Sequence, residues 1–161
     1  MTVEEYNKSV DEYSDSVYRF ILHNIHDVDK AKDVVQDTYI KLWEKVKDVE
    51  YTKSRSYIFT TAYHTMIDAI RKNKKSVRLE GVEFYQASNN KEYLGLKELL
   101  KDAVNKLPEI QRSVILLRDY EGYSYEEIGQ ITGLNESQVK VYIYRARLFL
   151  KEYIGSLENV I

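Results

Sequence analysis

The sequence predicts an all-α fold of two small helical domains joined by a flexible linker. Apolar residues recur three and four positions apart on both sides of residues 76–95, which is the period of one helix face. One proline and six glycines leave few turns for a sandwich or barrel. Within residues 76–95 this period is lost, and glycines with the run Ser88–Asn90 are typical of a linker. We expect an N-terminal domain at 1–76, a linker at 77–95 and a C-terminal domain at 96–161.

The N-terminal domain is expected to contain three helices. The first spans residues 3–25 and begins at a capping box formed by Thr2 and Glu5. The second runs from about Val28 to Lys47, with Asp27 as its cap. Its apolar arc is wide and includes Ile40 and Trp43, which suggests a contact with another protein.

The third helix, at residues 53–75, combines aromatic, polar and basic side chains. Phe59 and Tyr63 share an apolar stripe, while Thr60 and His64 belong to a polar stripe beside it. A site for single-stranded DNA combines aromatic side chains that stack on bases with cations that follow the phosphates. Each stacked base contributes about 1–3 kcal/mol of binding free energy. The alternative is a helix with a solvated basic end, since cations are favourable at a helix C-terminus in any case.

Charge is distributed unevenly along the chain. The net charge is −2. Residues 1–50 hold twelve acidic and seven basic side chains, whereas residues 53–78 hold seven basic side chains against Asp68 alone. A basic block inside an acidic protein indicates a local site for a polyanion.

Several classes of protein are disfavoured by what the sequence lacks. Without cysteine there is no disulfide, thiolate metal site or cysteine nucleophile. No apolar run approaches the ~20 residues of a membrane span, and the acidic N-terminus is unlike a signal peptide. We therefore expect a cytoplasmic protein with no direct membrane insertion.

The histidines do not form a convincing catalytic or metal site. His23 and His26 could share a helix face, but only Asp27 and Asp29 lie nearby as further ligands. His64 has no evident nucleophile to activate. There is also no glycine-rich phosphate loop. We expect no metal, no cofactor, no small-molecule substrate and no enzymatic activity.

The C-terminal domain should contain four helices, of which the last two form a helix-turn-helix. Ser124 with Glu127 predicts a capping box, Gly133 can end the short helix, and Asn135 with Gln138 caps the next. The second helix of such a motif normally enters the DNA major groove. An ordinary helical hairpin is the alternative.

The outer face of the last helix carries side chains suited to DNA. Gln138 can pair with adenine, Arg145 with guanine, and Val141 can touch a thymine methyl. Arg145, Arg147 and Lys151 could instead hold phosphates.

Three stretches of the chain resemble bacterial sigma factors. Asp33–Trp43 resembles the region 2.2 helix, and residues 57–72 resemble regions 2.3 and 2.4. Leu107–Arg118, followed by Tyr123–Arg147, looks like region 4. Regions 1.1 and 3 are lacking, as in the extracytoplasmic function (ECF) group. The resemblance therefore implies an ECF sigma factor of the sigma-70 family.

The resemblance implies a transcription initiation factor with three sets of binding residues. Core RNA polymerase would be bound by Asp33, Gln36, Asp37, Lys41 and Glu44. The −10 promoter element would be opened and read by Tyr57, Thr60, Tyr63, His64, Arg71, Lys72, Lys74 and Lys75. The −35 element would be read by Ser137, Gln138, Lys140, Val141, Tyr142, Arg145 and Arg147. Such factors are commonly held by an anti-sigma factor, often a membrane-linked one.

The chain departs from the family pattern at three of these positions. His64 replaces an amide often placed to hold an extruded base, Gln138 stands where Thr is frequent, and Tyr142 where Arg is common. These departures put the promoter preference in question. A stand-alone helix-turn-helix regulator and a helical adaptor without a DNA role are the alternative functions.

Overall fold

The computed structural model describes residues 1–80 and 96–158, with side chains described for residues 1–72 and 99–155. These residues form helices and no strand, which confirms the predicted fold class. The α-helices are α1 (Val3–Ile25), α2 (Val28–Glu44), α3 (Ser54–Glu80), α4 (Leu96–Asn105), α5 (Glu109–Ile115), α6 (Tyr125–Thr132) and α7 (Glu136–Glu158). A 3₁₀ turn, η1 (Tyr51–Lys53), precedes α3, and a π-helical segment, η2 (Leu116–Tyr120), continues α5.

The predicted helix starts at Val3 and Val28 are confirmed by their caps. Thr2 and Glu5 form a reciprocal capping box, in which each side chain accepts from the other's backbone N–H. The Asp27 carboxylate accepts from the N–H of Lys30. Each such cap stabilises its helix by about 0.5–2 kcal/mol.

Two helix ends differ from the prediction. Helix α2 ends at Glu44, before the predicted Lys47, because Lys45 N–H donates to the carbonyl of Leu42 and tightens the last turn. Helix α3 continues to Glu80, beyond the predicted residue 75 and into the predicted linker. Residues 73–80 contain neither glycine nor proline, so nothing in the sequence ends the helix before Gly81. The rest of the predicted linker lies outside the described residues.

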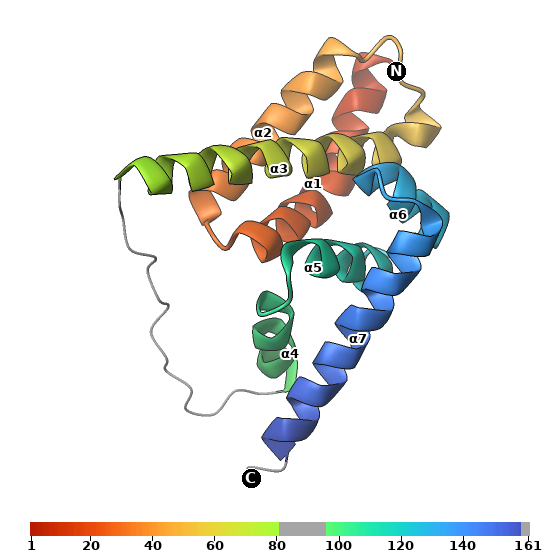
Figure 1. The fold of residues 1–161 in the computed structure, drawn as a ribbon. Helices are drawn as coiled ribbons and strands as arrows, with labels where there is room; N and C mark the ends of the chain where they lie inside the picture. Colours follow the sequence, from red (N-terminus) through yellow and green to blue (C-terminus); the bar gives the residue numbers. More distant parts are fainter. Residues whose placement is uncertain (81–95, 159–161) are drawn as a thin grey trace.

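Helices α1, α2 and α3 form the N-terminal bundle, in which α3 crosses the other two (Figure 1). Its core contains the fully buried side chains of Val17, Ile21, Leu42, Ile58 and Met66. Their spacing matches the apolar periods that predicted the helices.

Helices α4–α7 form the C-terminal bundle, in which α4, α5 and α6 all pack against the long α7 (Figure 1). Val139, Ile143 and Ala146 form the buried face of α7, as their spacing predicted. Leu150, on the same face, is half-buried.

The two bundles contact each other directly, and we call this the docked arrangement. Helix α6 lies against α3, and α5 lies against α1 (Figure 1). The rings of Phe59 on α3 and Tyr123 before α6 are 5.4 Å apart between centroids, and both side chains are fully buried. The apolar cores of the two bundles therefore merge into one cluster.

Candidate nucleic-acid interface

The predicted helix-turn-helix is formed by α6, a tight turn and α7. Ser124 and Glu127 make the expected capping box at the start of α6. Gly133 ends α6 with a φ of 82°, a left-handed conformation that favours glycine. Gly129 is required by packing, since a Cβ there would lie 2.8 Å from the carbonyl oxygen of Leu134. The two glycines allow the chain to turn closely enough for α7 to cross α6.

The start of α7 combines a cap with the proposed base-reading side chains. Ser137, Gln138, Lys140 and Val141 are exposed. The Oε1 atom of Gln138 accepts from the N–H of Asn135 at 3.0 Å, while Asn135 Oδ1 accepts from the N–H of Gln138 at 2.8 Å. The acceptor of Gln138 is thus engaged in the cap, and its amide NH₂ is the group left to meet DNA.

The cations of α7 have neighbours within the C-terminal bundle. Lys140 lies 3.5 Å from Glu136, and the Arg145 guanidinium lies 5.9 Å from the ring centroid of Tyr142, which is half-buried. Arg147 donates to Asp119 at 2.8 Å. Exposed ion pairs contribute only about 0–1 kcal/mol, so Lys140 and Arg147 can exchange these partners for phosphates at little cost.

Helix α3 presents its predicted polar stripe to solvent. His64, Asp68, Arg71 and Lys72 are exposed, whereas Thr60 is half-buried and its hydroxyl donates to the Ser56 carbonyl at 2.7 Å. Tyr57 is half-buried. Lys74 and Lys75 belong to α3, but their side chains lie outside the described residues. The described cations Arg71 and Lys72 are therefore exposed in the C-terminal half of α3, but they do not end the helix as predicted, because α3 continues to Glu80.

The polar face of α2 is also exposed. All five predicted polymerase-binding residues are exposed: Asp33, Gln36, Asp37, Lys41 and Glu44. At 100° per residue, Ile40 lies at the centre of this face, where its side chain is 56% exposed. Lys41 differs from the others, because its ammonium donates to the Thr65 hydroxyl of α3 at 2.9 Å. An apolar centre with a charged rim is typical of a protein-binding surface.

Comparison with known proteins identifies the family of this chain. Family models of sigma-70 region 2 and sigma-70 region 4 match residues 10–76 and 97–150. The RNA polymerase sigma factor SigV of Bacillus subtilis is 30% identical over 141 residues, which cover 85% of this chain and 83% of SigV. The chain belongs to the sigma-70 family. This confirms the resemblance on which the site residues were chosen.

Further relatives place this sigma factor in the ECF group. ECF RNA polymerase sigma factor SigM of Bacillus subtilis is 28% identical over 156 residues, covering 94% of each chain. A solved structure of the sigma factor RpoE with the anti-sigma factor NepR, from Bartonella quintana, superimposes with a TM-score of 0.81. It is 27% identical and covers 95% of this chain and 98% of RpoE. The fold of this sigma factor is therefore shared over nearly the whole chain.

In the docked arrangement, region 4 covers part of the proposed −10 surface of region 2. Tyr63 is 5% exposed and Phe59 is fully buried. Burial raises the pKa of the Tyr63 hydroxyl, and Glu109 of region 4 lies close enough to add to that effect. The sequence predicted an aromatic stripe on α3 but not that another part of the chain would cover it. Base stacking on Tyr63 stays a prediction, and its ring is not accessible while region 4 is docked.

Sequence reasoning missed the polar contacts that join the two regions. Arg55 of region 2 donates to the carbonyl oxygen of Glu121 at 2.6 Å and lies 3.8 Å from its carboxylate. The same guanidinium lies over the Tyr123 ring, 4.4 Å from its centroid. In the sequence Arg55 counted only as one cation of the basic block. Its position one helical turn before Phe59 was the available signal that it borders an apolar surface.

Metal-binding groups and membrane spans are both absent from the described residues. These residues contain no group of three His, Asp or Glu side chains arranged to hold a metal. None of their helices combines the length and apolarity that a bilayer span requires.

Proposed function

We propose that this sigma factor binds core RNA polymerase and directs it to promoters, where region 2 opens and reads the −10 element and region 4 reads the −35 element. One observation supports the proposal: a single chain presents an exposed apolar side chain with a charged rim on α2, exposed cations on α3 and an exposed outer face on the helix-turn-helix. The chain would act as a binding factor in the cytoplasm, where polymerase and promoters are found. The chemistry of RNA synthesis would belong to polymerase.

Polymerase would bind the α2 face with Ile40 at its centre. The surrounding Asp33, Gln36, Asp37 and Glu44 would set specificity, because charged rims mainly govern partner choice and association rate. Lys41 would have a different role, since it ties this face to α3 through Thr65. Binding of polymerase to α2 would therefore also affect α3, the helix that opens DNA.

On DNA, α7 would enter the major groove of the −35 element. Gln138, Val141 and Arg145 would face base edges, and Lys140 and Arg147 would hold phosphates. On α3, Arg71, Lys72, Lys74 and Lys75 would follow the backbone, while Tyr57, Thr60, Tyr63 and His64 would meet the separated strand. Ser137 and Tyr142 would flank the −35 contact.

Reading both elements requires the two regions to separate. The elements lie about 25 base pairs apart, which is roughly 80 Å of duplex at about 3.4 Å per base pair. In the docked arrangement Phe59 of α3 and Tyr123 of region 4 are in ring contact. We infer that the promoter-bound form is open and that polymerase binding holds the regions apart.

An anti-sigma factor is proposed as a second protein partner. The RpoE structure that superimposes on this chain contains the anti-sigma factor NepR. A protein that stabilises the docked arrangement would keep Phe59 and Tyr63 covered and would oppose promoter opening.

Reconstituted transcription tests the proposed function. Core polymerase with the full chain should start RNA synthesis at defined sites on promoter fragments from its own genome, and core polymerase alone should not. The variant Lys140→Ala, Arg145→Ala should reduce initiation where the −35 element is needed. Failure at every such promoter would contradict the proposal, and tight footprinting of duplex DNA without polymerase would favour a stand-alone regulator.

A further inference from the structure

Two of the three histidines lie on the boundary between region 2 and region 4. His23 is in the last turn of α1, and His26 is its C-cap, in a left-handed conformation with a φ of 60°. Neither residue belongs to the proposed polymerase or promoter surfaces. Both face cations, and histidine is the side chain whose charge changes between about pH 5 and 8.

His26 accepts its contact from an arginine of region 4. Nη1 of Arg112 lies 3.4 Å from Nε2 of His26 and also donates to the Asn105 carbonyl at 3.2 Å. Because a guanidinium has only donors and stays charged, Nε2 must offer a lone pair, which requires a neutral ring. Protonation of His26 would place two cations 3.4 Å apart. Glu109 is the acidic group that influences Arg112.

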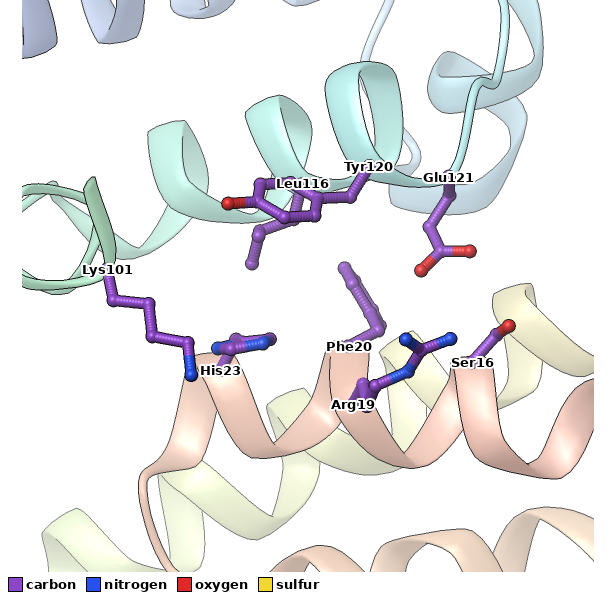
Figure 2. A pocket seen from close by; sticks show the side chains of 8 residues that line it. All are labelled: Ser16, Arg19, Phe20, His23, Lys101, Leu116, Tyr120 and Glu121. Carbon is purple, nitrogen blue, oxygen red and sulfur yellow. The ribbon is translucent and has the colours of Figure 1, made fainter. Parts of the chain in front are cut away.

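His23 borders a cavity that lies between the two regions (Figure 2). Its volume is about 330 Å³, and its walls come from α1, α4 and η2. Lys101 of region 4 and Arg19 of α1 lie on either side of His23, while Tyr120 of η2 covers it, with ring centroids 6.3 Å apart. Glu121 lies at the far end of the cavity, where Arg55 is its ion-pair partner. A protonated His23 would therefore meet two cations.

We propose that the docked arrangement is a proton-sensitive latch, which opens when His23 and His26 are protonated. Neutral imidazoles suit positions beside Arg112 and Lys101, whereas protonated ones would be repelled by these cations of region 4. Separation of the regions exposes the half-buried ring of His23 to water and moves both cations away from the histidines, while His26 is exposed in either form. Protons therefore bind more readily to the open form than to the docked form.

The direction of the pKa shifts agrees with this geometry. Burial lowers the pKa of His23, with Lys101 and Arg19 adding to the effect. Partial burial also lowers the pKa of the His26 ring, and the nearby charges of Arg112 and His23 add to this effect. A pKa that is lower in the docked form means that docking is fully stable above the ordinary histidine value near 6.5 and weakens as pH falls below it.

Glu121 acts in the opposite direction. Burial raises the pKa of its carboxyl group against the opposing effects of Arg55 and Arg19. Its protonation therefore favours the docked form, an effect that begins as pH falls through this raised pKa and is complete below the ordinary glutamate value of about 4.3. Glu121 thus opposes the histidines at the acidic end of the range, and a Glu121→Gln background isolates their response.

The consequence for transcription rests on the proposed function. Opening would uncover Phe59 and Tyr63 on α3 and would release region 4 to reach the −35 element. Mild acidification would then raise the fraction of the sigma factor that is ready to bind polymerase. The latch itself is a property of the free chain and can be measured without polymerase or DNA.

A distance measurement tests the latch directly. The chain has no cysteine, so Lys32→Cys on α2 and Glu152→Cys on α7, both exposed positions, allow a donor and an acceptor dye to be attached. Transfer efficiency should be constant from about pH 8.5 to 7 and should fall between about 6.5 and 5.5. For each pKa unit by which docking lowers a histidine, the open-to-docked ratio should rise by up to about tenfold.

Variants separate the latch from general acid effects. His23→Gln with His26→Asn should remove the pH response, and asparagine suits the left-handed backbone at position 26. Each single variant should remove part of it, which keeps the test valid if the double variant fails to fold. His64→Gln, on the exposed stripe of α3, should respond like the unaltered chain.

Three results would overturn the proposal. The first is a transfer efficiency that does not change with pH. The second is a pH response of both single variants that equals that of the unaltered chain. The third is a loss of helical circular dichroism in parallel with the distance change. None of them depends on transcription, so a failed latch and a failed initiation assay remain distinguishable.

Discussion

Ser113 of region 4 donates a hydrogen bond to Asn24 Oδ1 of region 2 at 2.9 Å, in the buried contact between the two regions. Ser113 is fully buried and Asn24 is 4% exposed. The amide nitrogen of Asn24 donates to the Phe20 carbonyl of its own helix at 2.8 Å. Each group of the Asn24 amide thus has a partner, but the Oδ1 partner exists only while the regions are docked.

Replacing Ser113 by alanine should weaken docking. Asn24 Oδ1 would be left buried without a donor, which costs about 1–3 kcal/mol, whereas in the open form it would bind water. The open-to-docked ratio should therefore rise roughly 5- to 150-fold, measured with the dye pair at pH 8. Ser9→Ala is the matched control, since Ser9 is also fully buried but donates to Tyr6 of its own helix. An equal effect of both variants would show that Ser113 has no special role in docking.

Arg55 should stabilise docking mainly through its backbone and ring contacts. Glu121→Gln removes the carboxylate at 3.8 Å but leaves the Glu121 carbonyl at 2.6 Å and the Tyr123 ring. The Arg55 side chain is 38% exposed, so its ion pair is partly screened. Arg55→Ala should therefore open the chain more than Glu121→Gln. Their coupling in a double-mutant cycle should be about 0.5 kcal/mol, at the low end for contacting residues. Equal effects of the two single variants would instead make the charge pair dominant.

Local signals predicted the helices well, and contacts between distant segments account for what was missed. The capping boxes at Thr2 and Ser124 depend on residues three apart, so the sequence contains all the information needed to recognise them. The covering of Tyr63 depends on region 4, which lies across the linker in sequence. A periodic apolar stripe shows that a helix face is covered but not what covers it.

The prediction of the candidate site residues was limited in the same way. Exposure of Asp37 and Gln36 followed from helix geometry alone. The contact of Lys41 with Thr65 joins two helices, and the engagement of Gln138 in a cap competes with its proposed base contact. To predict either contact, one must know where the groups lie relative to each other in space, and residue types alone do not give this.

Gln138→Glu should separate the cap of α7 from base reading. A glutamate keeps an acceptor for the Asn135 N–H, so the thermal midpoint should change little. It loses the NH₂ donors and adds a negative charge near phosphates, so −35 affinity should fall by about 1–3 kcal/mol. Gln138→Ala should lose DNA affinity and also about 0.5–2 kcal/mol of helix stability. The readouts are anisotropy of −35 DNA with the polymerase complex and thermal unfolding. Unchanged affinity in the glutamate variant would remove Gln138 from the base-reading set.

Arg71→Ala with Lys72→Ala should flatten the salt dependence of promoter binding. Both side chains are exposed in the C-terminal half of α3. Each lost contact lowers the log–log slope by about 0.9 for duplex DNA or about 0.7 for a single strand. A total change near 1.4 would therefore assign the pair to the separated strand, and one near 1.8 to the duplex. Lys8→Ala, an exposed cation of α1, is the control. No change in slope would show that these cations are only a solvated surface of α3.

Asp37→Arg with Gln36→Ala should reduce binding of core polymerase by at least about tenfold, because like charges at an interface cost several kcal/mol. Both side chains are exposed on α2, so the free energy of unfolding should stay within about 0.5 kcal/mol. Binding is measured by titrating core polymerase into the labelled full chain, with unfolding followed separately.

Two further variants locate the polymerase contact on α2. Asp11→Arg makes the same charge change on an exposed position of α1 and should leave binding unaltered. Ile40→Ser should weaken binding without reversing any charge, since Ile40 is 56% exposed at the centre of the face. If charge reversal and Ile40→Ser both leave affinity unchanged, polymerase binds elsewhere. If only Ile40→Ser acts, the apolar centre rather than the acidic rim holds polymerase, and the rim then serves to select the partner.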